Sequence, residues 1–146
     1  MTRDPGLLEV TARTAIALPD GLEAAVRRAL EAIDLSAGLS LVLVDDAEIR
    51  GLNARFLDHD WATDVLAFPY DDAPPDAPDR IVGEVVVSVE TAAREAAARG
   101  LPLSRELLLY VLHGCLHLQG MEDATDEGRA AMAAAAERVL GEVLGG

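Results

Sequence analysis

The chain has 146 residues, of which 51% are hydrophobic, so it is long enough to bury one core of its own. Its 12 basic residues are all arginines, which excludes the lysine of a P-loop and the lysine of a Schiff-base enzyme. The 26 acidic residues give a net charge of −14, which argues against charge-driven, non-specific binding to nucleic acid.

A single cysteine excludes an intramolecular disulfide and suits a reducing compartment. The N-terminal segment lacks the apolar run of a signal peptide, and no later stretch is long enough to span a bilayer. We therefore expect a soluble, cytoplasmic protein that does not contact a membrane.

Hydrophobic periodicity predicts strands and helices along the whole chain. Apolar and polar residues alternate from Leu8 to Thr14, as in a half-buried strand, whereas Leu22, Val26 and Ile33 recur at helical spacing. In chain order, we expect a strand at 8–14, a helix at 22–33, a strand at 39–44, a helix ending near 56, strands at 63–68 and 81–89, and helices ending at 99, 118 and 143.

Polar residues suited to helix N-termini precede these helices. The candidate caps are Asp20, Asp45 or Asp46, Ser88 or Thr91, and Ser104. A glycine at position 100 is expected to end its helix in a left-handed conformation. The segment 69–80 holds four of the seven prolines and four aspartates, so we expect a surface loop there.

The order β-α-β-α-β-β-α-α-α predicts an α+β (α/β-like) fold. We expect a single domain over residues 1–146, in which about four strands form a small mixed sheet and about five helices pack on it. No internal repeat or domain boundary is evident in the sequence.

His113 and His117 form the most informative pair in the sequence. Four residues turn a helix by about 400° and rise about 6 Å, so both imidazoles can reach one cation. Gly120 can end the helix, and the reversed chain then brings Asp123 toward the same cation. Three protein ligands leave a position for water, as in catalytic rather than structural zinc sites. The pattern therefore favours a metal hydrolase.

These residues also have structural interpretations. A histidine on an apolar helix is usually a core residue, although two of them without a shared metal would be costly in a core. Asp123 can be the N-cap of the last helix, but Thr125 competes for that position and Glu122 competes for the ligand role. Cys115 points about 200° away from His113, so we expect a small buried hydrophobe.

Gly114 separates this pattern from that of the zinc proteases. Enzymes with the motif H-E-x-x-H place their general base, a glutamate, immediately after the first histidine. Glycine occupies that position here, so the sequence does not favour a peptidase.

Several blocks of this sequence resemble the YbeY family of bacterial endoribonucleases, which process ribosomal RNA. Residues 113–123 read H-G-C-L-H-L-Q-G-M-E-D, where the family has H-G-x-L-H-L-x-G-(Y/M)-D-H. Residues 63–69 read T-D-V-L-A-F-P and resemble T-(D/N)-V-L-S-F-P, and residues 83–88 read G-E-V-V-V-S and resemble G-D-I-x-I-S. Residues 43–53 also resemble the family's lead-in to these blocks, which follow in the family's order over about residues 39–132.

The resemblance implies a one-domain fold with a metal at the end of a cleft, and cleavage of single-stranded RNA during maturation of small-subunit (16S) ribosomal RNA. It implies one zinc ion per chain, held by His113, His117 and Asp123, the last at a position where the family commonly has histidine. Carboxylate is an acceptable zinc ligand, although its charge acidifies bound water less than a third imidazole would. Ribosomal RNA and the small ribosomal subunit are the implied partners.

The same resemblance suggests roles for four residues in or near the strands. Thr63, Asp64 and Ser88 are expected to line the RNA groove, although Thr63 and Asp64 can instead hold the strand entrance. Glu84 is expected either to orient a metal ligand or to be a buried structural carboxylate.

Leu57 departs from the family pattern, since many members carry at this position an arginine that helps catalysis. Arg55, or His59 in the loop that follows, is the candidate to supply positive charge to a phosphate instead. The alternative for both residues, weighted equally, is a solvated side chain without a catalytic role.

The leading hypothesis is hydrolysis of an RNA phosphodiester, in which the cation polarises a phosphoryl oxygen and acidifies water. One alternative is a metallohydrolase of a small substrate, which the negative charge favours. The other is a ribosome-assembly or RNA-binding factor with a structural metal, which Leu57 favours. The sequence does not choose zinc over nickel, iron or cobalt.

Overall fold

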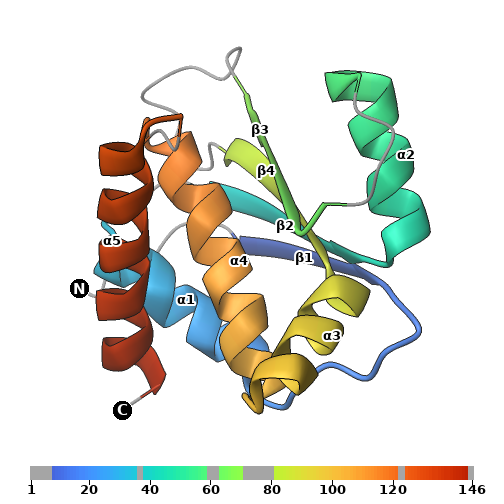
Figure 1. Cartoon of the computed structure of the whole chain (residues 1–146), viewed down its shortest axis with the longest axis horizontal. Coiled ribbons are helices and arrows are strands. Elements are labelled where there is room, and N and C mark those ends of the chain that lie inside the picture. The colour runs from blue at the N-terminus through green and yellow to red at the C-terminus, as the bar shows by residue number, and fades with distance from the viewer. Residues whose placement is uncertain (1–7, 36–37, 59–62, 71–80, 122–123, 145–146) are drawn as a thin grey trace.

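The computed structural model describes residues 8–35, 38–58, 63–70, 81–121 and 124–144. Within them, four strands and five helices follow one another in the predicted order (Figure 1). The strands are β1 (Leu8–Arg13), β2 (Gly38–Val44), β3 (Val65–Pro69) and β4 (Ile81–Ser88), and the helices are α1 (Leu22–Ala32), α2 (Asp46–Leu57), α3 (Val89–Arg99), α4 (Leu103–Leu118) and α5 (Asp126–Leu144). The predicted fold class is confirmed, and most of the predicted loop, 71–80, lies outside the described residues.

The four strands form one mixed sheet in the order β1-β2-β4-β3. β1, β2 and β4 are parallel, and β3 runs antiparallel to β4 at one edge. Parallel neighbours need a crossover connection, which α1 provides between β1 and β2. The chain reaches β4 only after α2 and β3, and β3 pairs with β4 from Val65 opposite Val87 to Pro69 opposite Gly83.

Helices cover both faces of this sheet, because successive strand residues point to opposite sides. Leu41 and Val85 belong to the large core that the sheet forms with α1, α3, α4 and α5. Val42 and Val86 point the other way and form a smaller cluster with Ile49 of α2. Figure 1 accordingly shows α4 between α5 and α3, with α2 standing apart from these helices.

Glycines end the two helices that flank the candidate site. Gly100, with φ 66°, follows α3, and Gly120, with φ 95°, follows α4. After α4, the Met121 N–H donates to the Leu116 carbonyl oxygen at 3.0 Å, and the Gly120 N–H donates to the His117 carbonyl oxygen at 3.0 Å. These two bonds form a Schellman motif, which turns the chain back on itself as the sequence predicted.

Two of the predicted N-caps are wrong. The residue before α1 is Gly21 rather than Asp20, and the residue before α4 is Pro102 rather than Ser104. Asp45 does precede α2, but its carboxylate caps nothing, since it accepts from Thr14 Oγ1 at 2.5 Å.

Two other caps are confirmed. The Ser88 hydroxyl accepts from the Thr91 N–H at 3.2 Å at the start of α3. The Thr125 hydroxyl accepts from the Gly128 N–H at 3.0 Å at the start of α5. Each bond satisfies an N–H group that the first turn of a helix leaves without a helical partner.

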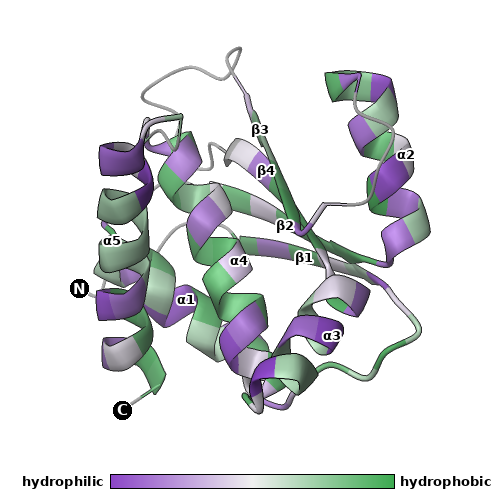
Figure 2. Ribbon diagram, in the orientation of Figure 1, coloured by the Kyte–Doolittle hydropathy of each residue, from purple (hydrophilic) through white to green (hydrophobic). Residues whose placement is uncertain are grey.

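Hydrophobic positions dominate the strands and much of α4, whereas α2 and α3 carry more hydrophilic positions (Figure 2). No helix within the described residues is long and apolar enough to cross a membrane.

Candidate active site

α4 carries both histidines and is buried along most of its length. Polar groups nevertheless follow one face of it, at Glu106, Tyr110, His113 and His117. The successive spacings of four, three and four residues keep these side chains on the same side of the helix. His113 is partly buried and His117 is exposed, so the polar face emerges from the core toward the C-terminal end of α4.

Gly114 explains how α4 lies so close to the sheet. A Cβ built on Gly114 would lie 2.6 Å from a methyl carbon of Val85 and 3.2 Å from one of Val65. The position after the first histidine therefore faces β3 and β4, away from the polar face. A glutamate base of the protease type has no room there, in agreement with the sequence argument.

The candidate metal ligands are only partly described. His113 and His117 share one face of α4, and Gly120 reverses the chain after them. Asp123 and Glu122 lie outside the described residues. Among the residues that are described, no group of three His, Cys, Asp or Glu side chains could hold a metal ion. Two imidazoles suit zinc as donors, so the described part of the set fits this metal, and the third ligand stays a prediction.

A cavity of about 440 Å³ opens beside His113. The entrance to β3, helix α3 and helix α4 supply the residues that line it: Thr63, Asp64, Thr91, Arg94, Glu95, Arg99, Leu109, Tyr110 and His113. The structure thus brings Thr63 and Asp64 together with the first histidine, although they are about 50 positions away in the sequence. Their contact with RNA stays a prediction.

Ser88 does not line this cavity. Its side chain is fully buried, and its hydroxyl donates to Asp46 Oδ1 at 2.5 Å while it caps α3. The expectation that Ser88 lines an RNA groove is therefore corrected: a residue without exposed surface has a structural role here.

Asp46 joins the start of α2 to α3. Its Oδ1 also accepts from Thr91 Oγ1 at 2.7 Å, and its Oδ2 accepts from Arg94 Nη1 at 2.7 Å. Burial by itself would raise the pKa of Asp46, but the hydrogen bonds from Ser88, Thr91 and Arg94 and the charge of Arg94 outweigh burial and lower that pKa.

Glu106 lies fully buried at the start of the polar face. Its Oε1 accepts from Arg99 Nη1 at 3.3 Å, and its Oε2 has no hydrogen-bond partner among the described residues. Burial raises the pKa of the Tyr110 hydroxyl, and the charge of the neighbouring Glu106 carboxylate raises it further. The buried Glu106 carboxylate therefore lies beside a guanidinium and a phenol that line the cavity.

Glu84 lies on the other face of the sheet from α4, in line with Val86. Its Oε2 accepts from Ser40 Oγ at 3.3 Å and from Tyr70 Oη at 3.5 Å. Because these contacts point away from α4, Glu84 does not orient His113 or His117 in the described structure, which corrects that expectation.

Arg55 lies on α2, with Cζ 5.7 Å from the centroid of the Phe56 ring. Phe56 itself contacts Phe68 on the α2 face of the sheet, at 5.8 Å between ring centroids. Leu57 is 46% exposed at the end of α2, and His59 lies outside the described residues. Arg55 is not among the residues that line the cavity beside His113, so its role stays a prediction.

Cys115 is fully buried, as expected from its position on α4. Burial raises the pKa of its thiol to about 12, so the group stays protonated at physiological pH.

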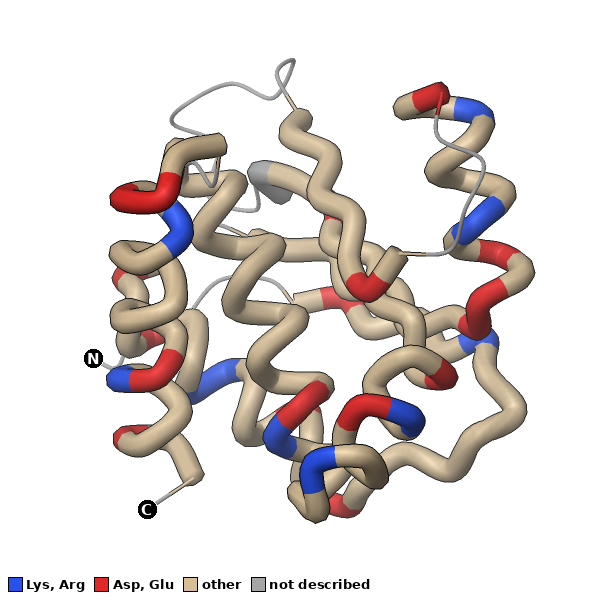
Figure 3. The backbone as a smooth tube through the Cα atoms, in the orientation of Figure 1, with Lys and Arg blue, Asp and Glu red and all other residues tan. Residues whose placement is uncertain are grey.

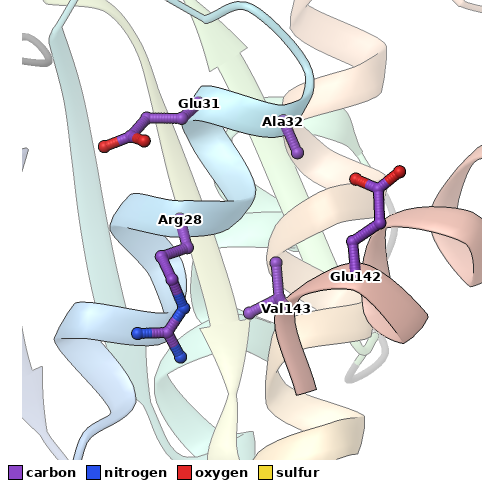
Figure 4. A pocket seen from close by; sticks show the side chains of 5 residues that line it. All are labelled: Arg28, Glu31, Ala32, Glu142 and Val143. Carbon is purple, nitrogen blue, oxygen red and sulfur yellow. The ribbon is translucent and has the colours of Figure 1, made fainter. Parts of the chain in front are cut away.

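A second hollow, of about 330 Å³, lies between α1 and α5 (Figure 4). Its charged lining is Arg28, Glu31 and Glu142, which leaves a surplus of carboxylates. Its lining, as far as the described residues show it, contains no histidine and nothing that indicates a ligand.

Sequence reasoning missed Arg94, Arg99 and Glu106. The spacing of Glu106, Tyr110, His113 and His117 was a usable signal, because these four residues share one helix face. The arginines gave no such signal, since their contacts with Asp46 and Glu106 depend on how the helices pack.

Most of the chain is similar to proteins of one known family. The sequence profile of the family described as endoribonuclease YbeY matches residues 11–144. A protein named endoribonuclease YbeY from Rhodopirellula baltica is 45% identical over 130 residues, covering 87% of this chain and 61% of that protein. Another from Moorella thermoacetica is 40% identical over 122 residues, covering 79% of this chain and 78% of that protein.

A solved structure with the same fold supports the observed architecture. It is the solution structure of TM1509 from Thermotoga maritima, which superposes with a TM-score of 0.64 at 24% identity and covers 95% of this chain and 90% of that one. This likeness supports the fold alone. The profile match spans nearly the whole chain, and the relatives keep about 40% identity over most of it. The chain therefore belongs to the endoribonuclease YbeY family.

Proposed function

We propose that this chain is a metal-dependent, single-strand-specific endoribonuclease that acts in the cytoplasm on 16S ribosomal RNA of the small ribosomal subunit during maturation. One observation carries the proposal: in a member of this family, His113 borders a cavity and shares a helix face with His117. We treat residues 1–146 as one such domain.

The proposed zinc ligands are His113, His117 and Asp123. When bound, zinc supplies Lewis-acid polarisation of a phosphoryl oxygen and makes water more acidic. The imidazole of His113 would be held at the cavity wall by the packing of Gly114 on β4, so its position depends on the core. Thr63 and Asp64 would bind or orient the RNA strand across the same cavity.

Metal analysis by mass spectrometry tests the ligand set, on protein purified without nickel. We expect about one zinc ion per chain in the wild type and a loss of zinc in His113→Ala and Asp123→Ala. Glu122→Ala is the matched control, because it removes the neighbouring carboxylate. Loss of zinc in Glu122→Ala but not in Asp123→Ala would show that Glu122, rather than Asp123, is the third ligand.

Cleavage assays test the activity, with single-stranded RNA, a duplex of the same sequence and a ribosomal RNA precursor as substrates. Wild-type protein should cleave the single strand and the precursor but not the duplex, and His113→Ala should cleave none of them. A metal-free His113→Ala protein that still cleaves RNA would refute metal dependence. Melting on chelation without any wild-type nuclease activity would favour an assembly factor with a structural metal.

A further inference from the structure

Two arginines of α3 bring positive charge to the cavity beside His113. Arg94 and Arg99 both line it, together with Asp64 and Glu95. Asp46 and Glu106 pair with these arginines from outside the lining, in a chain whose net charge is −14. Figure 3 shows basic and acidic positions next to each other along α3 and at the start of α4. The exposed guanidinium groups of these two arginines are the groups that can attract an anionic strand to this cavity.

Arg99 is held by a carboxylate that has no exposure to solvent. Its Nη1 donates to Glu106 Oε1 at 3.3 Å, and its Nη2 donates to Glu95 Oε1 at 3.4 Å. The Arg99 side chain is nevertheless 53% exposed. A guanidinium has five N–H donors in a planar fork, so these contacts fix the group and leave donors available toward the cavity.

Arg94 is likewise held by a hydrogen bond to a carboxylate, in this case that of Asp46 at the start of α2. Its Nη1 donates to Asp46 Oδ2 at 2.7 Å, its Nη2 donates to Thr91 Oγ1 at 3.1 Å, and its side chain is 62% exposed. The Asp46 carboxylate is itself fixed by Ser88. Both arginines are thus oriented before any ligand arrives, which reduces the entropy lost on binding.

Burial of the Glu106 carboxylate lowers the stability of the fold, so its presence calls for a functional explanation. A fully buried carboxylate whose second oxygen has no hydrogen-bond partner among the described residues destabilises a protein relative to an apolar side chain. The surrounding positions of α4, Leu107 and Leu108, are fully buried leucines, so an apolar residue would suit this helix. Its described interactions are with Arg99, at 3.3 Å, and with the neighbouring Tyr110 hydroxyl.

We propose that Arg94 and Arg99 bind phosphate groups of the RNA strand in this cavity, and that Glu106 is a positioning residue that holds Arg99 at the wall. The inference rests on the proposed endoribonuclease function and supplies the positive charge that Leu57 does not. Glu106 lies seven positions before His113 on α4, which corresponds to a rise of about 10 Å. Arg99 therefore contacts a nucleotide that flanks the one beside His113.

RNA affinity as a function of salt tests the two arginines. The probe is a short fluorescein-labelled single-stranded RNA with 2′-O-methyl groups, followed by anisotropy and checked on a gel to be intact afterwards. Arg94→Gln and Arg99→Gln should each weaken binding about three- to tenfold and reduce the slope of log K against log salt by about 0.7.

Arg13→Gln is the matched control. Arg13 is 54% exposed and also pairs with a carboxylate, Glu48, at 2.6 Å, but it lies on β1 at the sheet edge opposite β3. This variant removes the same charge and should keep more RNA affinity than either cavity variant. Equal affinity of all three variants would overturn the inference, because net charge alone would then explain the effect.

A double-mutant cycle tests Glu106. Glu106→Gln should weaken RNA binding in the wild-type background and have no further effect in the Arg99→Gln background. If Glu106 has only a structural role, Glu106→Gln should lower Tm and should change RNA affinity by the same factor in both backgrounds. That result would refute the positioning role.

Cleavage by the wild type separates this inference from the proposed function. If the wild type binds RNA through Arg94 and Arg99 but does not cleave it, the proposed function fails and the inference holds. If the wild type cleaves RNA, and both variants cleave it with unchanged KM and unchanged RNA affinity, the inference fails and the function holds.

Discussion

Gly114 controls how closely α4 approaches the sheet, because a Cβ at this position would lie 2.6 Å from a methyl carbon of Val85. Val85 is fully buried and β-branched, so its methyl groups cannot turn away. We expect Gly114→Ala to destabilise the protein by about 1–2 kcal/mol, since overpacking outweighs the better helix propensity of alanine. Urea unfolding measures the change.

Gly51→Ala is the control for this substitution. Gly51 lies in α2, and a Cβ there would meet nothing within 4 Å. Alanine should therefore stabilise the protein at position 51 by about 0.5–1 kcal/mol. Equal stabilisation in Gly114→Ala would show that α4 does not depend on this close contact.

At the residue scale, the sequence was informative where chemistry and spacing coincide within one helix. The sequence predicted correctly that His113 and His117 share one helix and that Gly120 follows its end, because both features depend on local helix geometry. Arg94 could not be found, since its partner Asp46 lies 48 positions earlier and only the packing of α2 beside α3 joins them. Ser88 was wrongly expected to line a groove, because its burial results from that same packing and cannot be seen in the sequence.

At the scale of the elements, Asp46 links α2 to α3, and its lowered pKa makes this link depend on pH. A carboxylate whose pKa is lower in the folded state stabilises the fold above its unfolded value of about 4, and the contribution is lost as pH falls through the folded pKa. We expect Asp46→Asn to be less stable than the wild type at pH 7, with the difference narrowing at about pH 3.

Urea unfolding at the two pH values tests this expectation. Asp20→Asn, at an exposed position before α1, is the control and should leave stability unchanged. A difference for Asp46→Asn that stays constant with pH would mean that shape, rather than charge, joins the two helices.

Element order was predictable, because hydrophobic periodicity distinguishes strands from helices. The N-caps were less predictable than the element order. Asp45 had the right residue type, but its carboxylate accepts a hydrogen bond from Thr14, 31 positions earlier, and does not cap α2. The strand order β1-β2-β4-β3 was not predictable from local pattern, since Val85, Val86 and Val87 give no alternation that marks the two faces of β4.

At the scale of the whole molecule, the net charge of −14 destabilises the compact state through self-repulsion. Raising NaCl from about 0.01 M to about 0.1 M shortens the Debye length from about 30 Å to about 10 Å. We expect this change to stabilise the protein by about 1 kcal/mol, or about 2–4 °C in Tm. Thermal melting at pH 7 measures the shift.

The same melts near the isoelectric pH of about 4.4 provide the control. Self-repulsion is small there, so added salt should change Tm little. A salt effect of the same size at both pH values would point to a cause other than net charge.

The burial of α4 determines how often the helix that carries the two histidines unfolds. Leu107, Leu108, Leu112 and Cys115 are fully buried in the core, and α4 contacts α1, α3, α5, β3 and β4. Amide hydrogens in the middle of α4 should therefore exchange with solvent at rates close to those of global unfolding, with or without metal. We therefore expect the histidine pair to keep its place as long as the fold does, and loss of the proposed zinc ion to be reversible without refolding.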